Sequence, residues 1–215
     1  MNATFMQRHP ALKDILNIFI FIVAVFLGTF IVNTYLFKTF NVVGPSMENT
    51  FYTNDRVIVN RLAVSLAHVQ NKEYIPRRGE IIVFRNPQYT PGTKDEYIVK
   101  RVIAFTGEKV KVINGVLFVY NKQYPDGFTP DSEFHSEPGS PTSKMSDEDG
   151  VTIPEGRIFV AGDHRQGKYS LDSRNGLGTI PYYDIVGPVA FRIFPFTSLR
   201  SFTHEGTDKW PRLSE

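Results

Sequence analysis

The sequence predicts a mostly β fold, in which an antiparallel β-rich domain is joined to one N-terminal transmembrane α-helix. Three observations support this prediction: one long apolar stretch near the N-terminus, many short runs rich in β-branched residues, and Gly and Pro residues between those runs. Hydrophobic residues make up 41% and charged residues 21% of the 215 residues. This composition is ordinary for a globular protein and argues against a chain that is disordered throughout.

The apolar stretch runs from Ile15 to Phe37, and no charged residue lies within it. At about 1.5 Å per residue, a helix of this length spans a hydrocarbon core of roughly 30 Å, whereas a cleavable signal peptide has an apolar region of only about 7 to 15 residues. No small-residue cleavage site follows the stretch. We therefore expect a transmembrane helix rather than a buried core helix or a cleaved leader.

The charges that flank the apolar stretch predict its orientation. Arg8 and Lys13 precede it, and only Lys38 closely follows it. By the positive-inside rule, residues 1–14 form a short cytoplasmic N-terminus and residues 38–215 form an extracytoplasmic domain. The sequence thus predicts a single-pass protein of the cell membrane, with the span at residues 15–37.

The β-rich runs that follow are expected to pair as antiparallel strands. They comprise residues 56–60, 80–84, 97–103, 109–113, 116–120, 157–161 and 185–194. Asn114 and Gly115 separate two of these runs and tolerate the positive φ of a tight turn, so they predict a β-hairpin. Leu62 to Val69 is a candidate for a short helix.

Between about residues 122 and 150 the composition shifts to Pro, Gly, Ser and acidic residues. Such a segment buries little apolar surface, so we expect an exposed insertion, either a plain solvated loop or a lid over a site. The whole chain has no cysteine and a formal net charge of +2. The missing cysteine excludes disulfides, cysteine nucleophiles and thiolate metal sites, and the small net charge indicates no nucleic-acid partner.

Residues that could carry chemistry lie at three places. Ser46 follows Gly44 and Pro45 shortly after the predicted membrane exit, where a turn could present its hydroxyl. Lys100 and Arg101 are neighbours in an apolar run. Because neighbouring strand residues face opposite sides, one of these cations should point into the domain, unless an edge strand lets both reach solvent.

The third place is a dense polar cluster that spans Gly162 to Gly176 and follows an apolar run. A cluster of this kind is either a hydrogen-bonded turn or a set of groups that holds a catalytic amine in place. The residues alone leave both interpretations open.

Four runs, in this order and after a transmembrane segment, resemble the sequence boxes of the bacterial type I signal peptidases, a family of Ser/Lys endopeptidases. They are residues 46–51, 78–84 with Pro87, 97–107 and 162–176. The resemblance covers almost all of the chain. It implies a membrane-bound serine endopeptidase with the family's antiparallel β-rich domain, exported preproteins with signal peptides as substrates, and neither a metal nor an organic cofactor.

Under this resemblance Ser46 is the nucleophile, its backbone N–H is an oxyanion donor, and Lys100 is the general base. A lysine accepts a proton only as the neutral amine, and at its ordinary pKa of about 10.4 only about one lysine in 2,500 is neutral at pH 7. Lowering that pKa to near 8 costs roughly 3.3 kcal/mol, which burial can supply. The residues implied to support the site are Gly44, Arg101, Asp163, Ser170, Asp172 and Arg174, with Ser170 bonded to the lysine. The expected apolar pocket residues are Met47, Phe51, Ile82 and Phe84.

The chain departs from the family pattern in several places. Asn49 stands where Pro is usual and His164 where Asn is usual. Gly44 stands where many members have a serine that contributes to the oxyanion hole, so a hydroxyl donor is missing there. The spacing between Arg165 and Ser170 is two residues longer than usual, which affects the placement of Ser170.

Other functions fit the sequence less well. A Ser/His/Asp triad would need Asp163 and His164 in line, but neighbours on one extended segment point apart. The histidines show no close metal-ligand spacing, which argues against a zinc hydrolase. A self-cleaving regulator on a related Ser/Lys fold typically carries a DNA-binding module, which is absent here, and an inactive membrane-tethered β domain that binds extended peptides is an alternative of another class. Ser46 lies only nine positions after Phe37, a stretch that reaches at most about 30 Å, so we expect the site near the outer membrane face.

Overall fold

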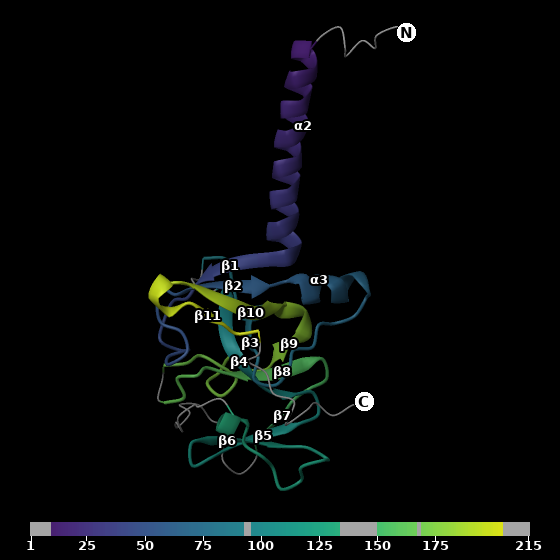
Figure 1. Ribbon diagram of the computed structural model, residues 1–215. Coiled ribbons are helices and arrows are strands. Elements are labelled where there is room, and N and C mark those ends of the chain that lie inside the picture. The colour runs from purple at the N-terminus through teal and green to yellow at the C-terminus, as the bar shows by residue number, and fades with distance from the viewer. Residues whose placement is uncertain (1–9, 93–95, 134–149, 167–168, 204–215) are drawn as a thin grey trace.

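The computed structural model describes residues 10–92, 96–133, 150–166 and 169–203. One long helix projects from a β-rich domain (Figure 1). Helix α2 (Pro10–Ile31) continues through a π-helical turn, η1 (Val32–Leu36), and then becomes strand β1 (Phe37–Asn41). The most apolar 18 consecutive residues within 11–36 have a mean hydropathy of 2.8 and are not buried against the domain, so their apolar surface is matched to a bilayer. The apolar helix is confirmed, although Phe37 belongs to a strand and not to the helix.

The main sheet contains eight strands in the order β1-β2-β10-β3-β4-β8-β9, with β11 paired to β10. All of its pairs are antiparallel. Its strands beyond β1 are β2 (Arg56–Asn60), β3 (Ile81–Arg85), β4 (Tyr97–Phe105), β8 (Arg157–Ala161), β9 (Ile180–Pro181), β10 (Ile185–Phe194) and β11 (Arg200–Ser201). The predicted strands are confirmed to within two residues, and β1, β9 and β11 are additional.

A smaller sheet with the order β6-β5-β7 lies at the end of the domain farthest from α2 (Figure 1). It is made of β5 (Lys109–Ile113), β6 (Val116–Tyr120) and β7 (Val151–Thr152). Asn114 at φ 50° and Gly115 at φ 78° form the turn between β5 and β6, as predicted. Helix α3 (Leu62–Val69) confirms the candidate short helix, and the short helical turns are η2 (Pro130–Glu133), η3 (Tyr182–Asp184) and η4 (Phe196–Ser198).

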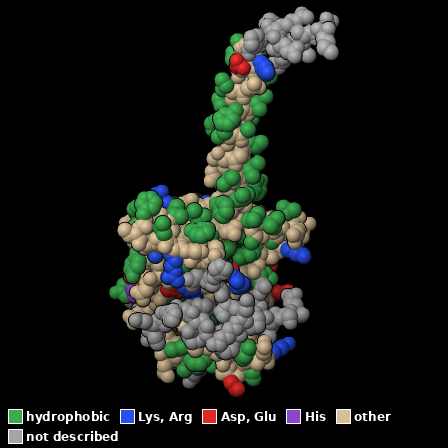
Figure 2. Space-filling view, viewed as in Figure 1, with side chains coloured by type: hydrophobic (Ala, Val, Ile, Leu, Met, Phe, Trp, Pro, Cys, Tyr) green, Lys and Arg blue, Asp and Glu red, His purple; other side chains and the backbone are tan. Residues whose placement is uncertain are grey.

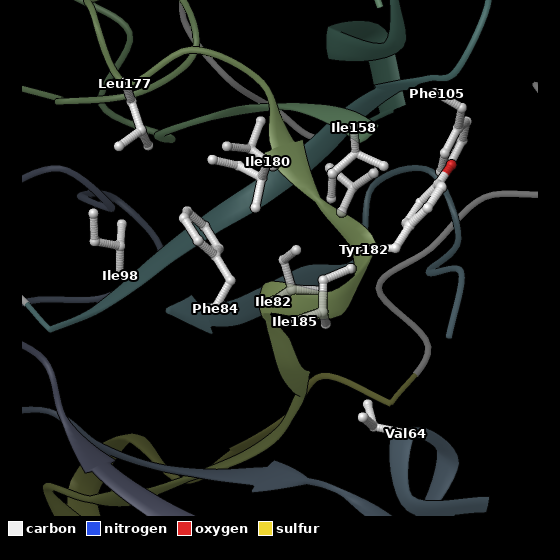
Figure 3. Packing of buried hydrophobic residues seen from close by; sticks show 12 residues of the cluster. Val64, Ile82, Phe84, Ile98, Phe105, Ile158, Leu177, Ile180, Tyr182 and Ile185 are labelled. Carbon is white, nitrogen blue, oxygen red and sulfur yellow. The ribbon is translucent and has the colours of Figure 1, made fainter. Parts of the chain in front are cut away.

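The main sheet packs apolar side chains on both of its faces. One cluster gathers Ile82, Phe84 and Val102 with residues of β8, β9 and β10 (Figure 3). Another cluster, on the opposite face of β3, gathers Ile81 and Val83 with residues that include Met47 and Phe51. Both faces of strand β4 are covered as well, because Val102 belongs to the first cluster and Ile103 belongs to a third cluster that includes Phe159. Lys100 and Arg101 are therefore both buried, with exposures of 3% and 2%, whereas the sequence predicted that one of the two points into the domain.

The start of the predicted insertion packs against the domain. Phe128 is only 5% exposed and forms an isolated antiparallel β-bridge with Val119. Its ring makes a T-shaped contact with the ring of Tyr124. The expectation of an exposed segment is therefore wrong near Phe128, because one aromatic ring is enough to fasten this stretch to the small sheet. Residues 134–149 of the predicted insertion lie outside the described residues.

Candidate active site

Ser46 and Lys100 meet inside the β domain, although 54 positions separate them in the chain. Lys100 Nζ lies 2.7 Å from Ser46 Oγ and also donates to the carbonyl oxygen of Val99 at 2.8 Å. The lysine comes from the middle of β4, and Ser46 comes from the turn that follows β1. A polar contact of this length lets a proton move directly between the two side chains.

The turn that presents Ser46 depends on Gly44. This residue has φ +90°, a backbone conformation that side-chain-bearing residues rarely adopt, and its N–H donates to Thr53 Oγ1 at 3.1 Å. Pro45 has no N–H, and no described residue accepts a hydrogen bond from the backbone N–H of Ser46. That N–H is therefore available to a ligand. The carbonyl of Ser46 accepts from the N–H of His164 at 3.2 Å.

Arg101 and Asp163 form a buried ion pair behind the serine. Arg101 donates through Nε at 2.8 Å and through Nη2 at 2.7 Å, and its Nη1 donates to the carbonyl of Gly79 at 2.9 Å. The Thr50 hydroxyl also donates to Asp163. Burial alone would raise the pKa of Asp163, but the charges of Arg101 and Arg165 and these hydrogen bonds outweigh burial and hold the pKa below its ordinary value.

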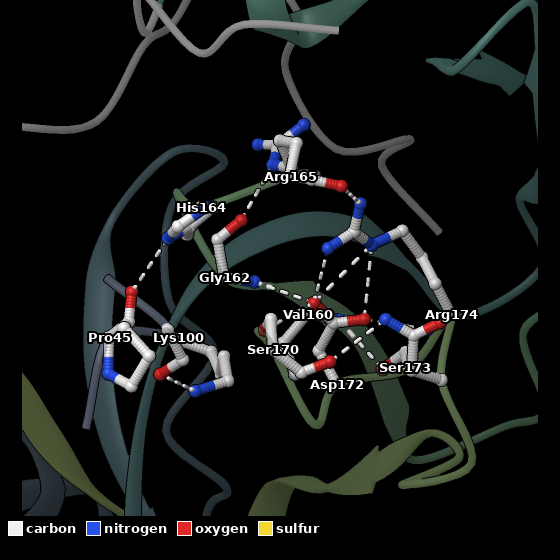
Figure 4. Close-up of polar contacts among 12 residues, drawn as sticks. Pro45, Lys100, Val160, Gly162, His164, Arg165, Ser170, Asp172, Ser173 and Arg174 are labelled. Carbon is white, nitrogen blue, oxygen red and sulfur yellow. Dashed lines mark hydrogen bonds and ion pairs between the residues drawn. The ribbon is translucent and has the colours of Figure 1, made fainter. Parts of the chain in front are cut away.

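Gly162, Ser170, Asp172 and Arg174 form a second buried network (Figure 4). Asp172 Oδ2 accepts from the Ser170 hydroxyl at 2.6 Å, from the N–H of Gly162 at 2.9 Å and from Arg174 Nη2 at 2.7 Å. Burial would raise the pKa of Asp172, but Arg174, Ser170 and Gly162 together lower it. The Ser170 proton goes to Asp172, so the hydrogen bond from Ser170 to the lysine stays a prediction.

Asp163 and His164 point apart, as expected for neighbours on an extended segment. His164 Nδ1 lies 3.2 Å from the carbonyl oxygen of Pro45 and 3.4 Å from Glu48 Oε2. Its ring stacks on Tyr169, with the ring centroids 4.4 Å apart and the planes 22° apart. Asp163 instead pairs with Arg101 on the buried side. This arrangement cannot relay a proton from Ser46 through His164 to Asp163.

A groove of about 490 Å³ opens beside Ser46 and Lys100. Most of its walls come from three chain segments, around β1, around the first half of β4 and after β8, and β2 and β3 contribute one residue each. They are residues 40–46, Val57, Val83, 96–100, Tyr169 and Leu171. In the described part of the chain, no group of three or more His, Cys, Asp or Glu side chains is placed to hold a metal ion.

The four expected pocket residues occupy core positions instead. Met47, Phe51, Ile82 and Phe84 are fully buried, and none of them lines the groove. The reason lies in the alternation of strand side chains: Ile82 and Phe84 share the face that packs into the cluster of Figure 3, so Val83 between them faces the groove. Tyr169 and Leu171 line the groove without having been predicted; they flank Ser170, for which the longer spacing after Arg165 predicted only an effect on its own placement.

Comparison with known proteins decides the family. The sequence profile of the family described as signal peptidase, peptidase S26, matches residues 12–194. The chain belongs to this family. Among S26 relatives, signal peptidase IB of Staphylococcus aureus (strain COL) is 30% identical over 203 residues, which cover 91% of this chain and 98% of that protein. Signal peptidase I P of Bacillus subtilis subsp. natto is 30% identical over 171 residues, 80% of this chain and 84% of that protein.

A solved structure is also similar to part of the chain. It is the crystal structure of a signal peptidase I from Enterococcus faecalis V583, with 24% sequence identity and a TM-score of 0.36. The similarity covers 53% of this chain and 96% of that chain. The four sequence runs that resemble the signal peptidases all lie within the residues that match the family profile.

Proposed function

We propose that this protein is a membrane-bound serine endopeptidase that removes signal peptides from exported preproteins, with Ser46 as nucleophile and Lys100 as general base. The observation that carries the proposal is the 2.7 Å contact between Lys100 Nζ and Ser46 Oγ at the wall of a groove. A serine hydroxyl is a weak nucleophile until a nearby base takes its proton, and this contact supports Lys100 as that base.

Lys100 acts as the neutral amine. Its side chain is buried, and burial disfavours the charged ammonium form. The amine then donates one proton to the carbonyl of Val99 and keeps its lone pair for the Ser46 proton. As Oγ attacks the scissile carbonyl, the proton passes to Nζ, and Lys100 returns it to the leaving amine as general acid. Water then attacks the acyl-enzyme and regenerates Ser46, again with Lys100 as base.

The backbone N–H of Ser46 supplies oxyanion stabilisation. It has no acceptor among the described residues and lies one bond from the Cα that carries the nucleophile. The carbonyl of the same residue is held by the N–H of His164, which fixes the peptide planes around Ser46. A donor that is already oriented needs no reorganisation when charge develops on the substrate oxygen.

The buried pairs hold these groups in position. Arg101 follows Lys100 on β4, and its bond to Asp163 ties β4 to the segment after β8. Asp172 ties Ser170 and Gly162 to the same segment. A displacement of about 1 Å at the reacting atoms can lower a rate by roughly 10²-fold, so such ties support catalysis without touching the substrate.

The groove suits an extended peptide. Its walls include the segment 42–45 and the first half of β4, which can offer backbone hydrogen bonds to a substrate strand. We place the N-terminus in the cytoplasm and the β domain outside, since exported preproteins emerge on that side. The cleavage site of a preprotein whose signal peptide is still in the bilayer then lies near the height of Ser46.

The test is cleavage of a signal-peptide-derived soluble peptide and of a full preprotein by the purified full-length protein. Ser46→Ala and Lys100→Ala should each abolish cleavage, and the double variant should be no worse than either, because the two residues act as a unit. Lys100→Arg should also be inactive, since guanidinium stays protonated. Lys122→Ala, at an exposed lysine, is the matched control and should keep full activity. Strong residual cleavage in Ser46→Ala would refute the assignment.

A further inference from the structure

Helix α3 is fastened to the end of the membrane anchor. The N–H of Arg61 donates to the carbonyl of Leu36 at 2.7 Å, and Arg61 Nη1 donates to the carbonyl of Thr34. Ser65 Oγ donates to the carbonyl of Tyr35 at 2.9 Å. The residues Thr34, Tyr35 and Leu36 form the last turn before β1, so α3 begins where the anchor leaves the bilayer.

One face of α3 is apolar and exposed. Leu62, Leu66 and Val69 have exposures of 44%, 50% and 81%, and they form one stripe because they are spaced by four and then three residues. Val64 is 6% exposed and packs into the domain core. At 100° per residue, each residue of the stripe lies about 140° to 160° around the helix axis from Val64, so the stripe faces away from the core.

The stripe also faces the side of the domain from which the anchor rises. Ser65, which bonds to the anchor's last turn, lies within about 40° to 100° of each stripe residue around the helix axis. Figure 1 shows α3 beside the base of α2 on that side of the domain, and Figure 2 shows hydrophobic side chains over this region. An anchor that crosses the bilayer brings this side of the domain against the lipid headgroups.

We propose that α3 lies in the outer interface of the bilayer, with Leu62, Leu66 and Val69 buried at the boundary between lipid headgroups and acyl chains. The occupant is lipid because the stripe is continuous with the membrane-spanning surface, to which three hydrogen bonds fix it. Polar residues that directly follow the stripe, Gln70 to Lys72, are exposed and can remain among the headgroups.

The contact of α3 with lipid would also affect activity, a consequence that rests on the proposed function. A domain held by a single helix can tilt about its attachment point, whereas a second contact with the membrane restrains that tilt. The height of the groove above the bilayer is then constant, which raises the effective concentration of a membrane-embedded cleavage site at Ser46.

The lipid contact can be tested without any activity measurement. The chain has no cysteine, so single-cysteine variants can be spin-labelled in the full-length protein in vesicles of phosphatidylethanolamine and phosphatidylglycerol. Labels at Leu62→Cys, Leu66→Cys and Val69→Cys should collide preferentially with dissolved oxygen. Labels at His68→Cys, on another face of α3, and at Lys122→Cys should collide preferentially with a water-soluble nickel chelate.

Two outcomes of this experiment would overturn the proposal. If the stripe labels favour the nickel chelate as much as the controls do, α3 lies in water. If they are protected from both reagents, a protein surface covers the stripe in place of lipid. The far-domain label at Lys122 shows in either case that the vesicles and reagents behave as intended.

An activity arm separates this inference from the proposed function. Leu66→Gln with Val69→Gln should leave cleavage of a soluble peptide unchanged and reduce cleavage of a vesicle-embedded preprotein by about tenfold, because only the second substrate uses tethering. If the double variant cleaves each substrate as fast as the parent protein does, the role of α3 in positioning is refuted. If the parent protein cleaves neither substrate, the proposed function fails while the spin-label result still decides the membrane contact.

Discussion

Gly162 offers the sharpest structural test of how tightly the candidate site is packed. A Cβ placed on this residue would lie 2.2 Å from Ser170 Oγ and 2.3 Å from the carbonyl oxygen of Ser46. Its φ lies outside the left-handed range, so the glycine is needed for space and not for backbone conformation. Gly162→Ala should therefore push apart the two segments that carry Ser46 and Ser170.

The size of the effect follows from these distances. Ordinary contacts to a Cβ begin near 3.4 Å, so both oxygens would have to retreat by roughly 1 Å. Overpacking of this kind costs about 1–3 kcal/mol of stability. If Ser46 is the nucleophile, as we propose, a shift of about 1 Å at this residue lowers kcat/KM by roughly 10²-fold. The assays are peptide cleavage for kcat/KM and thermal unfolding for stability, both on the full-length protein.

Gly156→Ala is the control that separates lost stability from lost geometry. Gly156 has φ +70°, and a Cβ added there would meet no atom within 4 Å, so alanine is strained by about 1–2 kcal/mol but displaces nothing. We expect similar destabilisation of both variants, with activity lost only in Gly162→Ala. Activity of Gly162→Ala within about threefold of the parent protein would refute the steric reasoning.

Three further predictions concern residues around Ser46. Asp163→Asn should destabilise the domain by about 3 kcal/mol at pH 7, because Arg101 loses its buried countercharge, as urea unfolding would measure. Folding lowers the pKa of Asp163, so the stability that its carboxylate contributes is fully present above the ordinary pKa of 3.8 and is lost as the pH falls toward the folded-state pKa. The unfolding free energies of the parent protein and the variant should therefore converge in acid. A difference between them that stays constant down to about pH 2 would contradict this sign. His164→Asn should keep peptide cleavage within a few-fold of the parent, since an amide can also bond the carbonyl of Pro45, whereas complete loss would revive a histidine base. Tyr169→Ala should lower kcat/KM for long peptides more than for short ones, because this exposed ring lines the groove; an equal effect on both lengths would exclude a contact with the substrate.

The helices and strands that could be predicted are those whose residue pattern lies within the element itself. The anchor and the longer strands follow from hydrophobic composition, and the β5-β6 hairpin follows from Asn114 and Gly115. Strand β9 includes Pro181 and spans only two residues, and β11 is equally short. These strands form because β8 and β10 offer hydrogen-bonding partners. A pattern of two residues cannot predict pairing with a strand that is distant in sequence.

The site shows the same limit at the level of side chains. Sequence motifs predicted Ser46 and Lys100, whose side chains are in contact in the structure, but they could not tell which face of β3 meets the groove. A shift of one residue exchanges the two faces of a strand. The predicted pocket residues Ile82 and Phe84 therefore face the core, and Val83 between them lines the groove. The orientation depends on how β3 and β4 pack against the loop after β1, which is a property of the assembled sheet.

Three parts of the chain that lie far apart in sequence hold Ser46. Lys100 on β4 contacts its hydroxyl, the N–H of His164 after β8 donates to its carbonyl, and Gly44 sets the turn before it. The ion pair of Arg101 with Asp163 joins two of these parts directly. Because a buried pair that loses one partner is strongly destabilising, the ties that stabilise the fold also set the distance between Ser46 and Lys100. Substitutions in this pair should therefore change stability and rate together, whereas substitutions in the far sheet of β5, β6 and β7 should change stability alone.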